Sequence, residues 1–371
     1  MPRNRLKVLL LAASLLTMVT TASGCGFKDI DKRFFVFTIG VDKGQNGKTY
    51  KVELKLAIPT PQERFGSNKF IIVTEEADSI TEAVRIIKSK IDKELDFGQA
   101  KAIVLGEKLM REMNDPGPLL DWFIRRRDIQ MIAWVGIGRP DAMTILEAGP
   151  PSERLPSNLL FMFFGQSGTE TAYVVSEYLF DFRRRLTERG LDPILPIIEK
   201  RSGDQLTINR TAVFNKKNWV LELDPQQTKI FNAFYNNIGK VDIKVKEKGV
   251  YVLLSADQVK VNYKLRDIRS EKPRVTVTMT VKGSIEETQS SEKVTDLDKF
   301  EALAAKEISV RIRSLLSTLQ KAHVDPIGFG LRFRAMHRTD RKEWLRWQSL
   351  YPDVQFDVNA KVALRGSGII D

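Results

Sequence analysis

Side chains that commonly carry chemistry are scarce in this sequence of 371 residues, which contains two histidines and one cysteine. His323 and His337 lie on either side of a Gly-Phe-Gly turn. A zinc site needs more nitrogen or sulfur ligands than these, and no Gly-x-Ser-x-Gly sequence marks the nucleophile of a hydrolase. We therefore predict no metal site, no cofactor and no catalytic residue. Both histidines are interpreted as surface or hydrogen-bonded polar residues.

The cysteine, Cys25, lies in a context that predicts its modification. A basic start without acidic residues, an apolar run at 8–19 and the small residues 22–24 precede it. This order is typical of a secretory signal, and the run is shorter than the roughly 20 residues that span a membrane. Ala-Ser-Gly before cysteine also matches a bacterial lipobox, whose thiol receives a diacylglyceryl group. We predict a signal peptide at 1–24 and lipid attachment at Cys25. The alternative is an ordinary thiol after a secretion signal.

Composition indicates a packed body outside that segment. Apolar residues make up 42% of the chain and charged residues 29%, which is typical of a folded protein rather than a disordered one. The length favours two or three domains. A single cysteine excludes an internal disulfide, so packing alone must hold the cores together. No later segment is apolar over a length that would span a membrane.

The chain is basic, with 59 Lys and Arg against 47 Asp and Glu, a net charge of +12. Removal of the signal, with its three basic residues, leaves 12 − 3 = +9. Basic clusters occur at 125–127 and 183–185. Zinc-finger spacing, aromatic RNA-binding motifs and long basic arms are missing, so we predict no nucleic-acid partner. Attraction to anionic phospholipid headgroups explains the charge more simply.

Apolar periodicity predicts alternating strands and helices in the first half of the chain. An antiparallel hairpin is expected from strands at 34–42 and 52–58 around a glycine-rich turn. The further predicted elements are a strand near 70–74, a helix capped by Ser79, a strand at 102–105, helices from 107 to the arginines at 125–127, a strand at 129–137, a helix capped by Asp141, a long proline-containing loop, a helix over 174–190 and an extended segment at 192–196 that ends the first domain.

The second half has a different pattern. A hairpin is predicted at 212–221, and Asp224-Pro225-Gln226-Gln227 forms a helix start with a capping box. Four strands are expected around Ile243, Val252, Val261 and Val277, followed by a long helix at 299–321 and a final strand at 354–364. Trp344 and Trp347 would share a helix face, either as core anchors or as a contact patch. The predicted fold class is α+β, with mixed or antiparallel sheets packed against helices.

Several short sequences along the chain occur together in one known family. They are Gly24-Cys25, Ile39-Gly40-Val41-Asp42, the run KAIVLGE at 101–107, Arg127-Asp128 and Ala212-Val213-Phe214 with Asn215-Lys216-Lys217. The most specific is Asp325-Pro326-Ile327-Gly328-Phe329-Gly330, followed by Trp344, Phe356 and the strand to Gly366. With these motifs the chain resembles the Ger(x)C family, the lipoprotein C-subunits of bacterial spore germinant receptors. It departs from the family at Gly26, Lys217 and Trp219, where members often carry tryptophan, aspartate and leucine.

The resemblance implies a non-enzymatic lipoprotein of three α+β domains, which we place at 25–198, 199–282 and 283–371 with the long helix and final strand in the last. It implies assembly with two integral-membrane partners, an A-type and a B-type receptor subunit, at the outer face of the spore inner membrane. There the complex would respond to nutrients and trigger germination, while Cys25 would hold this subunit to the bilayer. The candidate interaction residues are Asp325, Gly328, Phe329, Gly330 and Trp344.

Two other classes stay open. A lipid-anchored solute-binding protein would need a hinge between two similar α/β lobes, and the sequence shows no such repeat. A cell-wall hydrolase would need a carboxylate pair or a metal site in a cleft. A nutrient that stabilises the isolated protein would favour the first class, and peptidoglycan cleavage by the purified protein would favour the second.

Overall fold

The computed structural model describes residues 32–57, 70–149, 158–165, 171–236, 238–247, 250–267, 270, 272–289, 297–336 and 342–365, together with residues 7 and 12–14. It divides the chain into an amino-terminal segment, Met1–Arg33, and a compact unit, Phe34–Asp371. The predictions for Cys25, His337 and Gly366 concern residues outside the described ranges. The compact unit is of mixed α+β class, as predicted, and contains two sheets.

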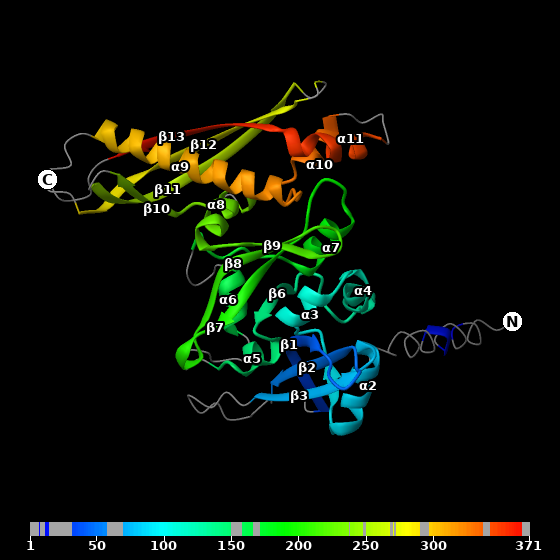
Figure 1. Ribbon diagram of the computed structural model, residues 1–371. Helices are drawn as coiled ribbons and strands as arrows, with labels where there is room; N and C mark the ends of the chain where they lie inside the picture. Colours follow the sequence, from blue (N-terminus) through cyan, green and yellow to red (C-terminus); the bar gives the residue numbers. More distant parts are fainter. Residues whose placement is uncertain are drawn as a thin grey trace. The chain divides into compact units, whose positions relative to one another are not determined.

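The first sheet has nine strands, in the order β3-β2-β1-β5-β6-β7-β8-β9 with β4 paired to β1 (Figure 1). Its strands are β1 (Arg33–Lys43), β2 (Tyr50–Ala57), β3 (Phe70–Ala77), β4 (Glu94–Asp96), β5 (Ala102–Gly106), β6 (Trp134–Arg139), β7 (Ile194–Lys200), β8 (Leu206–Phe214) and β9 (Trp219–Leu223). The central strands β1, β5, β6 and β7 are parallel, and the outer pairs are antiparallel. All five residues of β5 are buried, because helices cover both faces of a parallel sheet centre.

Two apolar clusters separate the helices on the two faces of this sheet. One contains Ile103 and Leu105 with residues of α2 (Ile80–Lys90), α3 (Glu107–Glu112), α4 (Gly117–Arg125) and α7 (Leu179–Thr187). The other contains Ala102 and Val104 with residues of α5 (Ala142–Glu147) and α6 (Asn158–Gly165). Successive β5 side chains thus enter opposite cores, as the two-residue period of a strand requires.

The second sheet has the order β10-β11-β12-β13, with strands Val241–Glu247, Val250–Arg266, Arg274–Thr288 and Gln355–Leu364. Helix α9 (Leu297–Lys321) lies along it (Figure 1), and α9 buries Ile308, Ile312, Leu315, Leu316 and Leu319. Side chains of α9 also occupy the open edge of β13. Ser309 and Glu301 accept hydrogen bonds from the amides of Ala360 and Leu364, at 3.2 and 2.7 Å. This pairing satisfies part of an edge that could otherwise template aggregation.

The remaining helices join the two sheets within the compact unit. They are α8 (Pro225–Tyr235), α10 (Phe329–Met336) and α11 (Glu343–Leu350), with the short turns η2 (Ser202–Asp204) and η3 (Tyr351–Asp353). One apolar cluster contains Val213 from the first sheet, Phe231 from α8 and Val277 from the second sheet. The two sheets therefore share a core at α8. Among the described residues, no helix combines the length and the apolar character needed to cross a bilayer.

Several local predictions are confirmed. The first hairpin forms, Ser79 and Asp141 cap α2 and α5 through their side chains, and Asp224 with Gln227 makes the full capping box of α8. The long helix and the final strand are present as α9 and β13. The division into three domains stays a prediction, and its two internal boundaries fall within β7 and β12.

Four predictions of elements were wrong. Residues 174–178 are not helical, and α7 begins at Leu179. The strand expected from 129 starts at Trp134, where pairing with β5 begins. The two strands expected around Val252 and Val261 form the single strand β11, whose register shifts near Gln258. The long loop after Asp141's helix contains α6, a helix without a charged residue.

Candidate functional site

The strongest sequence motif forms a buried turn around Asp325. Its carboxylate accepts hydrogen bonds from the amides of Gly328, Phe329 and Gly330, at 2.8, 3.1 and 2.6 Å. Gly328 directly precedes α10, and Phe329 and Gly330 begin its first turn, whose N–H groups lack partners within the helix. Asp325 thus acts as a helix cap, and its negative charge also matches the positive end of the helix dipole.

Asp325 is tied to a segment far away in the sequence. Its amide donates to Oδ2 of Asp192 at 2.6 Å, and the amide of Asp192 donates to the carbonyl oxygen of Asp325 at 3.0 Å. Asp192 lies two residues before β7, the fourth parallel strand of the first sheet. Lys216 lies 3.4 Å from the other Asp192 oxygen and donates to the carbonyl oxygens of Arg185 and Leu191. The two segments therefore share one polar cluster.

Arg185 completes this cluster, which we call the junction: Glu177, Arg185, Asp192, Lys216, Tyr235 and Asp325. One guanidinium nitrogen of Arg185 donates to the carbonyl oxygens of Asp192 and Pro326, each at 3.0 Å. Its Nε lies 3.3 Å from Glu177, whose second oxygen accepts a 2.5 Å hydrogen bond from Tyr235. The side chains of Arg185 and Glu177 are 4% and 0% exposed, so the pair is removed from water.

Burial dominates the electrostatics of the junction. It raises the pKa of Asp325 to about 7, against the opposing effect of the three amide donors. It likewise raises the pKa of Glu177 to about 7, while the charge of Arg185 acts the other way. Burial raises the pKa of Asp192 and lowers that of Lys216. These shifts express the cost of keeping charges in a dry interior.

Glycines allow the backbone around the junction to come close. Gly190 has φ of +86°, and a Cβ there would lie 2.5 Å from the carbonyl carbon of Gly330. The carbonyl oxygen of Gly190 accepts a 2.8 Å hydrogen bond from the amide of Leu331. A Cβ on Gly330 would lie 2.4 Å from Nε1 of Trp347. Glycine is therefore required at both positions by contact, and at Gly190 also by conformation.

The structure thus brings four of the predicted interaction residues together. Asp325, Gly328, Phe329 and Gly330 are buried, and their described polar contacts are within the chain. Trp344 is half-buried against the large core, whereas Trp347, the second tryptophan of α11, is a core residue. His323 is exposed just after α9. A partner contact by any of these residues stays a prediction.

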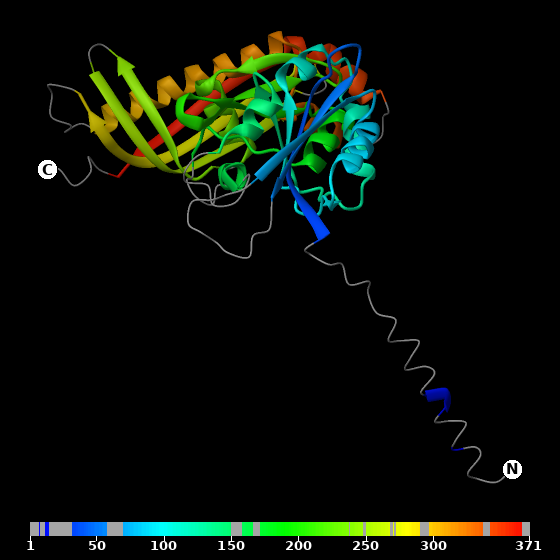
Figure 2. The same cartoon turned by 90° about the horizontal axis from the view of Figure 1, so that it is seen from below.

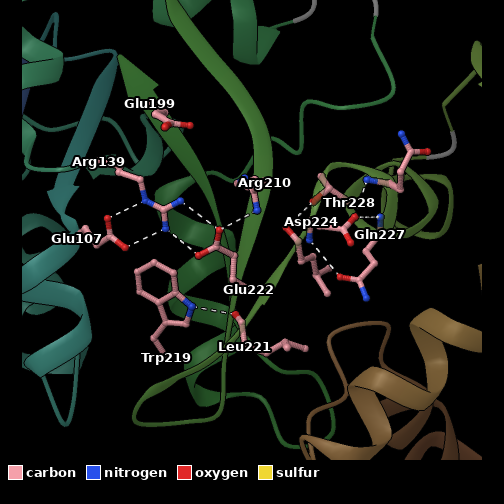
Figure 3. Close-up of polar contacts among 12 residues, drawn as sticks. Glu107, Arg139, Glu199, Arg210, Trp219, Leu221, Glu222, Asp224, Gln227 and Thr228 are labelled. Carbon is pink, nitrogen blue, oxygen red and sulfur yellow. Dashed lines mark hydrogen bonds and ion pairs between the residues drawn. The ribbon is translucent and has the colours of Figure 1, made fainter. Parts of the chain in front are cut away.

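A second polar cluster, centred on Arg139 at the end of β6, joins four elements (Figure 3). Arg139 forms paired hydrogen bonds with Glu107 at 2.7 and 2.9 Å and with Glu222 at 3.1 and 2.7 Å. Arg210 also donates to Glu222, at 3.3 Å, and Arg111 donates to Glu107 at 2.8 Å. These contacts link α3, β6, β8 and β9. Two-pronged arginine–carboxylate pairs are among the strongest hydrogen bonds in proteins.

The Arg139 cluster is electrostatically balanced. Hydrogen bonds from Arg139 lower the pKa of Glu222. Burial alone would raise the pKa of Glu107, but the hydrogen bonds from Arg139 and Arg111 bring it below its ordinary value. Both glutamates are therefore ionised and paired at neutral pH. Among the described residues, no group of three or more histidine, cysteine or acidic side chains is placed to hold a metal ion.

Two more of the motifs that carry the family resemblance, residues 39–42 and 101–107, meet at Asp42. Its carboxylate accepts from the amides of Ala142 and Met143 at the start of α5, at 2.8 and 3.1 Å. A Cβ on Gly106 would lie 1.8 Å from the same carboxylate, so this glycine makes room for it. Beside it, Glu53 is fully buried, and burial together with the charge of Asp42 raises its pKa to about 9. Glu53 is thus uncharged at neutral pH.

Sequence reasoning did not single out Glu177, Arg185 or Arg139. In the sequence, Arg185 stands out only as part of the basic cluster at 183–185. A signal was present, because Arg185 lies on the same face of α7 as the buried residues Phe182 and Leu186. For Arg139 and Glu177 there was no comparable signal, since their partners come from other elements.

Comparison with protein families decides the identity. The family "Spore germination protein N-terminal domain" matches residues 26–200, and the family "Spore germination B3/GerAC like, C-terminal" matches residues 209–368. The chain belongs to the Ger(x)C family of spore germination proteins. The predicted resemblance is therefore confirmed.

Individual Ger(x)C proteins are distant relatives. The spore germination protein GerQC of Bacillus cereus is 23% identical over 285 residues, which cover 75% of this chain and 77% of that protein. The spore germination protein KC of Bacillus subtilis (strain 168) is 23% identical over 398 residues, with coverage of 97% and 96%. The crystal structure of the GerBC protein matches with a TM-score of 0.53 at 18% identity, covering 87% of this chain and 96% of that one. This structural match supports the Ger(x)C fold.

Proposed function

We propose that this chain is the lipid-anchored C-type subunit of a nutrient germinant receptor. It is held at the outer face of the spore inner membrane through Cys25 and binds two integral-membrane subunits, one of A type and one of B type. Its own role is non-enzymatic: it presents a folded surface to its partners. The observation that carries this proposal is the match of both halves of the chain to spore germination families.

The lipid anchor is supported by the sequence around Cys25. A secretion signal that ends in a lipobox accounts for both the export of the chain and the modification of its cysteine. Cys25 is the only cysteine in the chain. Two or more acyl chains on one residue give stable membrane attachment, whereas one chain gives only marginal binding. An anchor of this kind needs no membrane-spanning helix in the body.

A binding role agrees better with the described geometry than a catalytic one. In both polar clusters the charged groups are engaged with one another or with backbone carbonyls. Two cavities, one lined by Lys229 and Met279 and one lined by Lys55 and Leu160, hold about 10 Å³ each. Such a volume accommodates about one water molecule, not an amino acid or a sugar. Neither cavity supports the alternative of a solute-binding protein.

The test is purification of the tagged protein from detergent-solubilised spore inner membranes, with mass spectrometry of its partners and of its N-terminus. We expect two multi-spanning proteins and an N-terminal peptide that starts at a diacylated Cys25. The Cys25→Ala variant should lose the membrane fraction and the partners, while Gly26→Ala should keep both. A protein recovered alone, with an unmodified thiol, would contradict the proposal.

A further inference from the structure

A row of stacked aromatic rings crosses from α6 to the start of α7. Trp134 stacks on Tyr178 with ring centroids 3.8 Å apart, and Tyr178 stacks on Phe180 at 5.6 Å. The ring of Phe164 lies 5.7 Å from that of Trp134 and is tilted by 33°. Backbone hydrogen bonds hold the two segments together, from Leu179 to Ala133 at 2.9 Å and from Phe180 to Met131 at 3.1 Å. The row is therefore a fixed part of the fold.

The outer end of this row is open to solvent. Ile132 is 61% exposed and Phe180 is 40% exposed. Single exposed apolar side chains are ordinary on protein surfaces, but Phe180 stacks on Tyr178, and Ile132 lies in the segment that is hydrogen-bonded to the start of α7. Trp134 itself is buried, at 8% exposed, and Tyr178 is half-buried, so the accessible apolar surface comes mainly from Ile132 and Phe180. Tyrosine favours the boundary between water and hydrocarbon, because it has an apolar body and one polar atom. We call Ile132, Trp134, Tyr178 and Phe180 the aromatic edge.

The aromatic edge lies where the chain from Cys25 enters the body. Phe37, Lys101 and Trp134 are at one level of three adjacent parallel strands, linked by amide–carbonyl hydrogen bonds of 2.9 Å. Strand β1 starts at Arg33, four residues before Phe37, which places its start about 13 Å beyond this level at the rise of a parallel strand. Figure 2 shows β1 running past its neighbours at this end.

The link between the lipid and the body is short. Cys25 and Arg33 are eight residues apart in the sequence. Even when fully extended, such a link reaches at most about 29 Å. A body held this close to the bilayer, by a link that enters at one edge of its sheet, turns that edge towards the membrane more readily than any other.

Two basic residues lie in the connections that precede β5 and β6, at the same end of the parallel strands. Lys101 precedes β5, and Arg127 lies in the turn before β6. In the part of the chain that the structure describes, neither has an ion-pair partner. The side chain of Arg125 is 82% exposed, and a guanidinium nitrogen lies 3.7 Å from a carboxylate oxygen of Asp121. Cations near a surface are attracted to anionic phospholipids, and long basic side chains reach the headgroups while their stems cover apolar groups.

We propose that the aromatic edge, with Lys101 and Arg127, is the surface that lies against the anionic bilayer. Ile132 and Phe180 insert among the headgroups, and the two cations pair with phosphates. The proposal rests on the proposed lipid anchor and adds the orientation of the body. The start of β1, where the tether joins the body, is at the same end of the parallel strands as Lys101 and Arg127. This coincidence of tether and cations favours a lipid surface over a protein partner.

The test uses the single cysteine. The mature chain is coupled through Cys25 to maleimide-bearing lipids in vesicles of phosphatidylglycerol and phosphatidylcholine, and side-chain exposure is measured by hydroxyl-radical footprinting. Labelling of Ile132 and Phe180 is expected to fall several-fold relative to the uncoupled chain. The matched controls are Leu345 and Val310, which are 66% and 51% exposed and should label equally in both samples.

Protection of the controls instead, or unchanged labelling of Ile132 and Phe180, would overturn the proposed orientation. Protection that appears only in native spore membranes, and not in protein-free vesicles, would overturn it in favour of a protein partner. Omission of phosphatidylglycerol should weaken the protection, and the Lys101→Gln/Arg127→Gln variant should weaken it equally. Because the coupling is chemical, this result does not depend on lipidation in the cell, which the N-terminal mass spectrum tests separately.

Discussion

Asp192 and Asp325 hydrogen-bond to each other in both directions, although 133 residues separate them. The amide of Asp325 donates to the Asp192 carboxylate at 2.6 Å, and the amide of Asp192 donates to the Asp325 carbonyl at 3.0 Å. Asp192 lies within the region matched by the N-terminal family and Asp325 within that of the C-terminal family. The junction therefore couples the two family regions through buried polar contacts rather than through apolar packing alone.

Asp325→Asn should destabilise the protein by about 1–3 kcal/mol, the cost of leaving a buried donor without a partner. An asparagine offers one carbonyl oxygen to the three amides of residues 328–330, and its NH₂ group would face one of them. The measurement is urea denaturation followed by tryptophan fluorescence. The matched control is Asp353→Asn, because Asp353 is exposed and should tolerate the change. Equal stability of the two variants would contradict the capping role of Asp325.

Arg185→Met should cost about 3–5 kcal/mol, because it leaves the buried Glu177 without its cation. The neighbouring Arg184 is the natural control. Its side chain is 48% exposed and pairs with Asp181 on the surface, so Arg184→Met should change stability by less than about 1 kcal/mol. The double variant Arg185→Met/Glu177→Gln should recover part of the loss, since no buried charge is then left unpaired. Similar losses for the two arginine variants would argue against a buried ion pair.

Elements with local causes could be predicted from the sequence. The capping box of α8 needs only Asp224 and Gln227, three residues apart, and it forms as expected. The stripe of α9 and the alternation of β13 are also short-range patterns, and each has one buried face. These predictions succeed because a single helix or strand supplies all the information.

Failures came from contacts between distant segments. Val174 and Val175 have apolar spacing that suits a helix, but the side-chain amide of Asn232 donates to the carbonyls of Ala172 and Val174 instead. These bonds hold the backbone of residues 172–174 outside a helix. The burial of Arg185 likewise depends on the carbonyl of Pro326, 141 residues away. Periodicity in one segment could not reveal either contact.

Gly190→Ala should destabilise the protein by about 2–4 kcal/mol, through a conformational cost near 1 and a steric cost of 1–3 kcal/mol. The added methyl group would lie 2.5 Å from backbone atoms of Gly330 and Leu331, which cannot rotate away. Gly203 separates the conformational cost from the steric cost. Its φ is +68°, but no atom lies within 4 Å of where an added Cβ would be. Gly203→Ala should therefore cost only the conformational part, about 1 kcal/mol. Equal losses in thermal or urea unfolding would rule out crowding at Gly190.

Arg139→Gln should cost about 1–3 kcal/mol at neutral pH, because Glu107 and Glu222 lose charged hydrogen bonds. The pKa values of both glutamates lie below the ordinary 4.5, so their contribution is present above pH 4.5 and is lost as the pH falls further. The variant should therefore be less sensitive to acid than the parent. Urea midpoints measured on both sides of pH 4.5 test this. If the variant loses stability below pH 4.5 as steeply as the parent does, Arg139 does not hold these pKa values down.

The junction should give the opposite pH dependence. Burial raises the pKa of Glu177 from 4.5 and of Asp325 from 3.8, each to about 7. Across this window the folded protein binds more protons than the unfolded chain, so stability should fall as the pH rises from 4.5 to 7. Glu177→Gln, which cannot ionise, should flatten the slope, whereas the exposed control Glu147→Gln should leave it unchanged. Urea denaturation at several pH values gives the slope directly. A parent stability that rises with pH over this range would mean that Arg185 and the three amide donors outweigh the cost of burial.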